Sequence, residues 1–328
     1  MKIKGVEFLI GADPEFAVFD LDRELFVPAC GLVPGDKLNP YALAVGDVQV
    51  DGTSVEIGIP PAKTKKQFVD SILKTKKLVQ EMLPPNHHLV CVPAVKYTPE
   101  VLSETPPEAF ISGCTPDYWL GEPRNPDTWG TTPKKTPHGF GYAYMGGHIH
   151  IGWTSGKSVE DPLHVIDCQV LVKILEEVLP KSVFNKGRSA SGYGTPSSYR
   201  IKPYGVEYRA PSNWWCHNKE TIEFMYDALK TALTEFMNIV QREDLIDRDD
   251  ILSGRYELDV ARCFIDTNKG YYAELVTTEE AGLEDTYSWA ILKELLRRKS
   301  VTTIKGKPTP STETISENIS EQNYALGA

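Results

Sequence analysis

The sequence lacks several features that would place it in a common class. Its 328 residues contain no run of 18 or more apolar residues, and the N-terminus MKIKGVEFLIGADPEF has no signal-peptide core. The six cysteines are scattered without a CxxC pair, which excludes a zinc knuckle or a dithiol redox motif. The motifs GxxxxGKS/T and GxSxG are also absent. These absences predict a soluble, cytoplasmic protein with reduced thiols and no membrane partner.

A basic character is also missing. The net charge is −10 and the sequence pI is near 5.3, which argues against non-specific binding to nucleic acid. What is present is an ordinary globular composition, 41% hydrophobic and 24% charged. The length allows one large domain or two small ones.

Apolar periodicity predicts four helices, at 64–83, 159–179, 219–243 and 287–298. Short runs rich in Val, Ile, Phe or Tyr predict strands at 5–10, 15–20, 47–51, 54–59, 88–95, 146–153 and 204–210. Strands and helices do not alternate strictly, so we expect an α+β fold with a mainly antiparallel sheet backed by helices on one face.

Residues 121–141 and 187–198 are rich in Gly, Pro or Ser and are expected to be surface or binding loops. From residue 300 onward the chain is polar and rich in Ser and Thr, with little to bury. We therefore predict a single domain over residues 1–299 and a mobile tail over 300–328.

The stretch GGHIHIGW at 146–153 places His148 and His150 two residues apart in a predicted strand. Residues i and i+2 of a strand face the same side, about 6.5–7 Å apart. Other predicted strand segments carry charged side chains in a similar way. Asp13 and Glu15 share this two-residue spacing, as do Glu207 and Arg209, and Glu56 stands between two apolar residues.

Carboxylates are depleted in strands and costly when buried unpaired, so several together need a common partner. A divalent cation such as Mg²⁺ or Mn²⁺ accepts carboxylate oxygens and imidazole, and arginine can clamp phosphate or carboxylate. Each group alone also has a structural interpretation: Asp13 could open a turn with Pro14, Glu56 could face solvent, and Glu207 could form a surface ion pair with Arg209.

Taken together, the motifs resemble those of the phage-type amidoligases, carboxyl-amine ligases related to glutamine synthetase and glutamate-cysteine ligase. The motifs span about residues 9–216 and are GADPEF, VDGTSVEIGIPPA, SGCTPDYW, GGHIHIGW and YRIKPYGVEYRAPSNWW. The resemblance implies a glutamine-synthetase-type catalytic domain, with a curved antiparallel sheet and helices packed on its outer face. It also implies ATP-dependent joining of a carboxylate to an amine through an acyl phosphate, with two or three Mg²⁺ or Mn²⁺ ions.

The resemblance also implies roles for individual residues. Those expected to bind metal are Asp13, Glu15, Glu56, His148 and Glu207. Those expected to contact phosphate or substrate are His150, Arg200 and Arg209. Arg188 and Lys202 are further candidates for contacting the nucleotide. The first strand reads D-x-E where glutamate-cysteine ligases have E-x-E, which leaves the number of metal ions open.

Two other interpretations remain open from the sequence. One is a metal-dependent hydrolase or a non-haem iron oxygenase built on His148, His150 and Glu207. The other is a binding protein that kept the fold and lost the chemistry. For a ligase, the expected partners are a carboxylate and an amine, each a small molecule or a peptide. An oligomer is possible, and the location would be the host cytoplasm if a phage encodes the protein.

Overall fold

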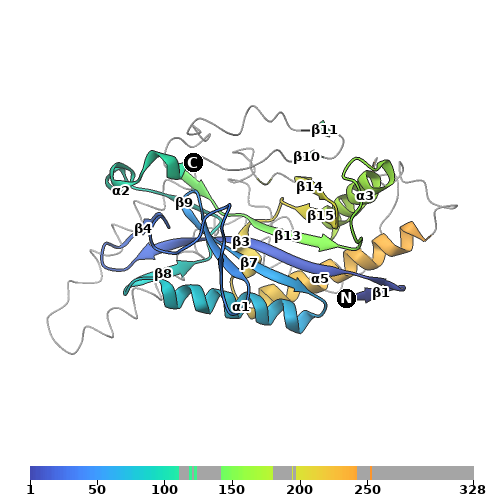
Figure 1. The fold of residues 1–328 in the computed structure, drawn as a ribbon, viewed down its shortest axis with the longest axis horizontal. Helices are drawn as coiled ribbons and strands as arrows, with labels where there is room; N and C mark the ends of the chain where they lie inside the picture. Colours follow the sequence, from blue (N-terminus) through green and yellow to red (C-terminus); the bar gives the residue numbers. More distant parts are fainter. Residues whose placement is uncertain are drawn as a thin grey trace.

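A large antiparallel β-sheet is the centre of the molecule (Figure 1). The computed structural model describes residues 1–110, 118–119, 122–123, 142–179, 194, 197–241 and 252. In this part of the chain, eleven strands form one sheet in the order β11-β10-β14-β15-β13-β3-β7-β6-β5, with β4 and β8 also paired to β3. Every strand pair among these residues is antiparallel. The predicted α+β fold with an antiparallel sheet is therefore confirmed.

The strands are short except for β3. They are β1 (Lys2–Ile3), β2 (Val6–Glu7), β3 (Leu9–Asp20), β4 (Leu25–Val27), β5 (Tyr41–Ala42), β6 (Asp47–Asp51), β7 (Ser54–Ala62), β8 (His87–Val90), β9 (Ala94–Lys96), β10 (Tyr118–Trp119), β11 (Glu122–Pro123), β12 (Tyr142–Tyr144), β13 (Gly147–Gly152), β14 (Tyr199–Lys202) and β15 (Gly205–Tyr208). The helices are α1 (Lys65–Met82), α2 (Pro99–Glu104), α3 (Pro162–Val178) and α5 (Lys219–Val240), with 3₁₀ turns η1 (Pro107–Phe110) and η4 (Asn213–Cys216).

Strand β3 differs from the prediction and is central to the sheet. The sequence predicts two strands, at 5–10 and 15–20, but the chain continues through GADPE as one strand of 12 residues. Pro14 is accommodated opposite Gly147 of β13, and the next amide, that of Glu15, donates to the Gly146 carbonyl at 2.8 Å. The alternative in which Asp13 opens a turn is therefore wrong, because Asp13 lies inside a paired strand.

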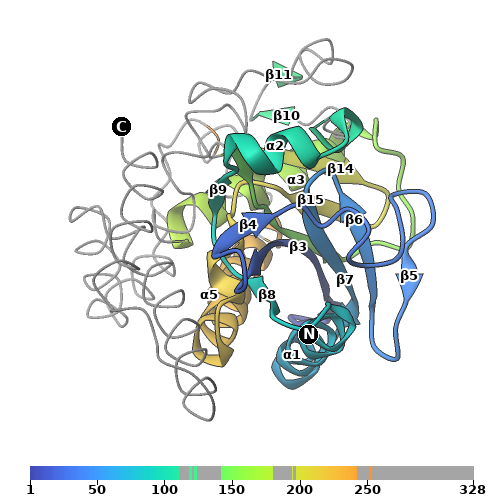
Figure 2. The ribbon, with the colours of Figure 1, turned by 90° about the vertical axis from the view of Figure 1, so that its left-hand side faces the viewer.

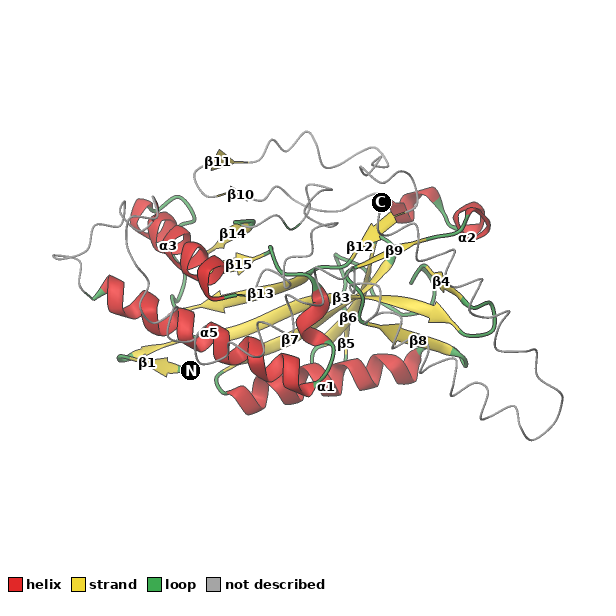
Figure 3. Cartoon of the chain, turned by 180° about the vertical axis from the view of Figure 1, so that it is seen from behind, coloured by secondary structure: helices red, strands yellow, loops and turns green. Residues whose placement is uncertain are grey.

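Helices α1 and α5 run along one face of the sheet (Figures 1 and 2), and α3 packs against α5, β14 and β15 (Figure 3). The face that the helices cover is formed by alternate residues of the strands. These residues are fully or almost fully buried: Ile10, Ala12, Phe16, Val55, Ile57, Ile149, Ile151, Val206 and Tyr208. Period-two alternation thus gives each central strand one apolar face and leaves the other for polar side chains.

Three of the four predicted helices are confirmed within a few residues. Helix α1 begins where the Thr64 side chain accepts the Gln67 amide, and it buries Phe68, Ile72 and Val79 along one stripe. Helix α5 begins with a capping box between Asn218 and Thr221. The helix predicted at 287–298 and the tail at 300–328 lie outside the described residues. No helix in the described part of the chain is long and apolar enough to cross a membrane.

The turn η4 is fixed against β13 by close backbone contact. A Cβ at Gly147 would lie 2.2 Å from the Ser212 carbonyl oxygen, so only glycine fits there. The Trp215 indole donates to the backbone carbonyl of Gly147 at 3.0 Å, and the side-chain amide of Asn213 donates to the backbone carbonyl of Glu15 at 2.8 Å. These bonds connect η4 to β3 and β13.

Candidate functional site

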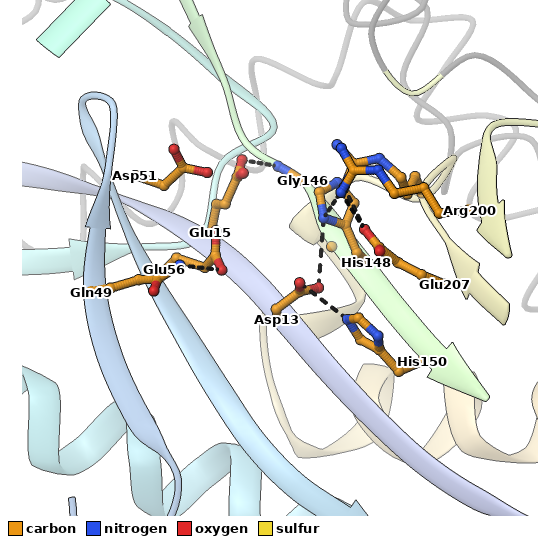
Figure 4. A network of polar contacts seen from close by, with 12 residues as sticks. Asp13, Glu15, Gln49, Asp51, Glu56, Gly146, His148, His150, Arg200 and Glu207 are labelled. Atoms are coloured by element: carbon orange, nitrogen blue, oxygen red, sulfur yellow. Dashed lines mark hydrogen bonds and ion pairs between the residues drawn. The ribbon is translucent and has the colours of Figure 1, made fainter. Parts of the chain in front are cut away.

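Polar side chains from six neighbouring strands share one face of the sheet. Strand register brings them together: Asp13 lies opposite His148, His150 opposite Glu207, and Glu15 opposite Glu56. In order across the sheet they are Arg200 and Lys202 on β14, Glu207 on β15, His148 and His150 on β13, Asp13 and Glu15 on β3, Glu56 on β7, and Asp47, Gln49 and Asp51 on β6. Figure 4 shows how most of these side chains lie.

Glu15, Asp51 and Glu56 form what we call the acidic end of this face. One carboxylate oxygen from each lies within 4.8 Å of the other two. The backbone amide of Gly146 donates to the Glu15 carboxylate at 2.5 Å, and the side-chain amide of Gln49 donates to the Glu56 carboxylate at 2.7 Å (Figure 4). Burial, followed by the charges of Asp13, Glu15 and Asp51, raises the pKa of Glu56 well above its ordinary value.

This arrangement fits a hard divalent cation. Three carboxylates this close together repel one another unless a cation or a proton lies between them, and this repulsion adds to burial in raising the pKa of Glu56. All three offer oxygen ligands, the kind that Mg²⁺ and Mn²⁺ prefer. The residues of the acidic end could therefore hold such an ion.

Asp13, His148 and His150 form the central group. The Asp13 carboxylate lies between the two imidazoles, 3.1 Å from His150 Nε2 and 3.5 Å from His148 Nδ1. Burial alone would raise the pKa of Asp13, but His150 and His148 outweigh that effect and lower it. Its buried Oδ1 atom faces His148 at 3.5 Å and has no shorter hydrogen bond from any of the described residues. Asp13 is therefore a charged carboxylate with an oxygen available to a further partner.

The two histidines have different surroundings. His148 is only 3% exposed and lies 3.4 Å from the Arg209 guanidinium. Burial and the charge of Arg209 lower the pKa of His148 to about 4, so this imidazole is neutral near pH 7. His150 is less buried; burial would lower its pKa, but Asp13 raises it overall. Together with Asp13 and Glu207, His150 offers ligand atoms within 4.8 Å of one another.

Arg200, Lys202, Arg209 and Glu207 form the basic end. Glu207 is 1% exposed, and all three cations contact it: Arg209 at 2.5 Å, Lys202 at 2.8 Å and Arg200 at 3.1 Å. Burial and the charge of Asp13 would raise the pKa of Glu207, but Arg209 and Arg200 outweigh them and lower it to about 2. One carboxylate facing three cations leaves this end with a local charge of +2.

The excess positive charge at the basic end suits an anion. Arginine guanidinium groups bind phosphate and carboxylate through a planar fork, and Glu207 holds Arg200 and Arg209 side by side. A cation site and an anion site therefore lie on one continuous sheet face, with Asp13 and the histidines between them.

Nine of the ten predicted site residues lie on this face, and their individual roles stay predictions. They are Asp13, Glu15, Glu56, His148, His150, Arg200, Lys202, Glu207 and Arg209. Arg188 lies outside the described residues. The sequence interpretation missed Asp51 and its neighbour Gln49. The signal was present, because DVQVD alternates polar and apolar residues as HIHIG does.

Comparison with known proteins gives little further identification. No family model matches the sequence, and no curated protein matches it. Among solved structures, the chain is similar to a bifunctional glutathione synthetase from Pasteurella multocida, with a TM-score of 0.43 and 13% sequence identity. The match covers 90% of this chain and 52% of that protein, so this chain spans about half its length.

Proposed function

We propose that this protein is an ATP-dependent carboxylate-amine ligase of the amidoligase type with a glutamine-synthetase-type catalytic domain. It would activate a carboxylate as an acyl phosphate and transfer the acyl group to an amine, forming an amide or peptide-like bond. The carboxylate and the amine would each be a small molecule or part of a peptide.

The observation that carries the proposal is the order of charge across one sheet face. Carboxylates gather at the acidic end and guanidinium groups at the basic end, and a single strand, β13, lies between the strands of the two ends. Phosphoryl transfer needs both, because it requires cations at the phosphate oxygens and donors aimed at the transferred group. The motifs that resemble amidoligases supply most of these residues.

In this proposal each end has a defined task. Glu15, Asp51 and Glu56 would hold Mg²⁺ or Mn²⁺, and Asp13 and His150, which form a separate group of possible ligands with Glu207, would offer further ligand atoms. The ions would offset the charge of the ATP phosphates, and ATP would supply the phosphoryl group. The side chains of the basic end would bind and orient anionic oxygens.

Glu207 requires an assignment different from that of a simple metal ligand. Its oxygens contact three cationic side chains, which would repel an additional cation. We assign Glu207 to holding Arg200 and Arg209 in position. We assign the metal-binding imidazole to His150, since His148 faces Arg209 at 3.4 Å.

The hydrolase and oxygenase alternatives would use both histidines with Glu207. Among the described residues, two groups of side chains could share a cation. One contains His150, Asp13 and Glu207, the other contains the three carboxylates of the acidic end, and His148 belongs to neither. An open iron site would also not explain the three cations of the basic end. The geometry therefore favours the ligase.

The test measures ADP release with Mg²⁺ across a panel of carboxylates and amines, with mass spectrometry to identify the products. Arg209→Lys keeps the charge but removes the planar fork, so it should reduce turnover by at least about 100-fold, as loss of a transition-state donor does. Arg23→Lys is the matched control, because Arg23 pairs with Glu100 and Glu104, away from the site. A wild-type protein that neither binds ATP nor releases ADP would rule out the proposal.

A further inference from the structure

Tyr204 lies in the turn between β14 and β15 and contacts the central group. Its hydroxyl oxygen is 2.5 Å from Nδ1 of His150, and the two ring centroids are 6.1 Å apart. On the other side of the imidazole, Nε2 of His150 lies 3.1 Å from Asp13. Both ring nitrogens of His150 therefore have a partner, and rotating the ring by 180° would break both contacts.

The turn that carries Tyr204 is tightly held. The Tyr204 carbonyl accepts the amides of Trp153 at 2.8 Å and Thr154 at 3.1 Å. Gly205, at φ 151°, lies so close to β13 that a Cβ would be 2.1 Å from the Ile151 carbonyl oxygen. A Cβ at Gly152 would lie 3.6 Å from the Tyr204 ring. The backbone thus fixes the place from which the hydroxyl reaches His150.

A hydroxyl suits this place because it can both donate and accept a hydrogen bond. When Nε2 of His150 donates its proton to Asp13, Nδ1 of a neutral ring accepts the Tyr204 proton. When Nε2 gives its lone pair to a cation, Nδ1 carries the proton and donates it to the Tyr204 oxygen. The same side chain therefore holds the ring in one orientation in both states.

We propose that Tyr204 is a positioning residue that orients His150 so that Nε2 faces Asp13 and the cation site. The inference rests on the proposed function for the identity of the cation, but the orientation of His150 is a property of the protein alone. Partners of the second imidazole nitrogen commonly change metal affinity by 10- to 100-fold. Tyr204, as the partner of Nδ1, would raise the affinity of the site for the metal ion by holding His150 in the binding orientation.

The test uses Tyr204→Phe, which removes the hydroxyl and keeps the ring. In the metal-free protein, at a pH high enough for His150 to be neutral, ¹⁵N spectra of the histidine side chains should show one tautomer of His150 in the wild type and a mixture in the variant. Titration with Mn²⁺, followed by the electron paramagnetic resonance signal of free ion, should show about a 10-fold weaker site in the variant. Tyr41→Phe is the control, because Tyr41 is 49% exposed on the edge strand β5 and should change neither result.

A double-mutant cycle separates positioning from general loosening of the structure. In a His150→Gln background, Tyr204→Phe should have no further effect on Mn²⁺ affinity. An unchanged His150 tautomer in Tyr204→Phe, or an equal loss of affinity in both backgrounds, would overturn the inference. If the wild type binds neither Mn²⁺ nor ATP, the proposed function fails, while the tautomer measurement still decides the role of Tyr204.

Discussion

The two ends of the polar sheet face solve opposite electrostatic problems. At the basic end, Glu207 is buried and neutralised by Arg200, Lys202 and Arg209, so the protein itself supplies the counter-charge. At the acidic end, Glu15, Asp51 and Glu56 face one another; Gln49 contributes a neutral amide, and the exposed Lys37 ammonium lies 3.8 Å from Asp51. The protein's own cations more than neutralise the carboxylate at the basic end, whereas the three carboxylates of the acidic end outnumber the cations beside them.

Because of this difference, removing a charge should change the stability of the protein in opposite directions at the two ends. Removing the Glu207 carboxylate from the basic end leaves its cations without their shared partner, which should destabilise the protein. Removing a charge from the acidic end relieves repulsion, which should stabilise the metal-free protein and weaken metal binding. The sign of a stability change therefore reports which end was altered.

The largest effect is expected for Glu207→Gln. The substitution keeps the size of the side chain but deprives the buried Arg209 and the partly buried Arg200 of this carboxylate, so the free energy of unfolding should fall by about 3–5 kcal/mol. Urea denaturation measures the change. The control Glu177→Gln removes a half-exposed pair with Lys173 and should cost less than about 1 kcal/mol. Equal stability of the two variants would show that the three cations do not depend on Glu207.

The pH dependence of stability should have opposite slopes at the two ends. Glu207 has a pKa lowered to about 2, so its stabilisation is present above its unfolded value of 4.5 and is lost as pH falls towards 2. Glu56 has a raised pKa, so its contribution is full below 4.5 and is lost as pH rises through the folded value.

The measurement is the free energy of unfolding of the wild type minus that of each variant, in EDTA. The difference for Glu207→Gln should shrink by about 3 kcal/mol between pH 4.5 and 2, and the difference for Glu56→Gln should fall as pH rises above 4.5. If the two differences changed in the same direction with rising pH, the two ends would not differ in the way described.

A smaller effect is expected for Glu56→Gln at neutral pH. Without metal, the variant should be more stable than the wild type by on the order of 1 kcal/mol, because one of three crowded charges is gone. With Mn²⁺ at 100 times its dissociation constant, the wild type should gain about 2.7 kcal/mol and the variant clearly less. Thermal unfolding with and without Mn²⁺ measures both, and exposed Glu81→Gln serves as the control. A destabilised variant without metal would contradict the repulsion at this end.

The smallest effect is expected for Lys202→Met. The lysine side chain is 32% exposed, and Arg200 and Arg209 still neutralise Glu207 when Lys202 is absent. The free energy of unfolding should change by less than about 1 kcal/mol. Urea denaturation beside Glu207→Gln measures the contrast. A loss comparable to that of Glu207→Gln would mean that all three cations are needed to neutralise the carboxylate.

The sequence was sufficient to predict which face each site residue occupies, because alternation in HIH, DPE and VEYR fixes side-chain direction along a strand. It was not sufficient to predict which residues are neighbours across strands, since the order of β14, β15, β13, β3, β7 and β6 depends on long-range pairing. The three cations around Glu207 follow from that pairing. The full length of β3 was also missed, because 5–10 and 15–20 were predicted as separate strands and proline normally lies at a strand end.

The strict alternation of the central strands has a consequence for how such a chain can change in evolution. One residue inserted within β13 would turn His148 and His150 towards the helices and bring Ile149 to the polar face, so strand length there is fixed. Insertions in the segments that connect strands leave the strand register intact. New substrate preferences would therefore arise by insertions and deletions between the strands of the site and hardly ever within them.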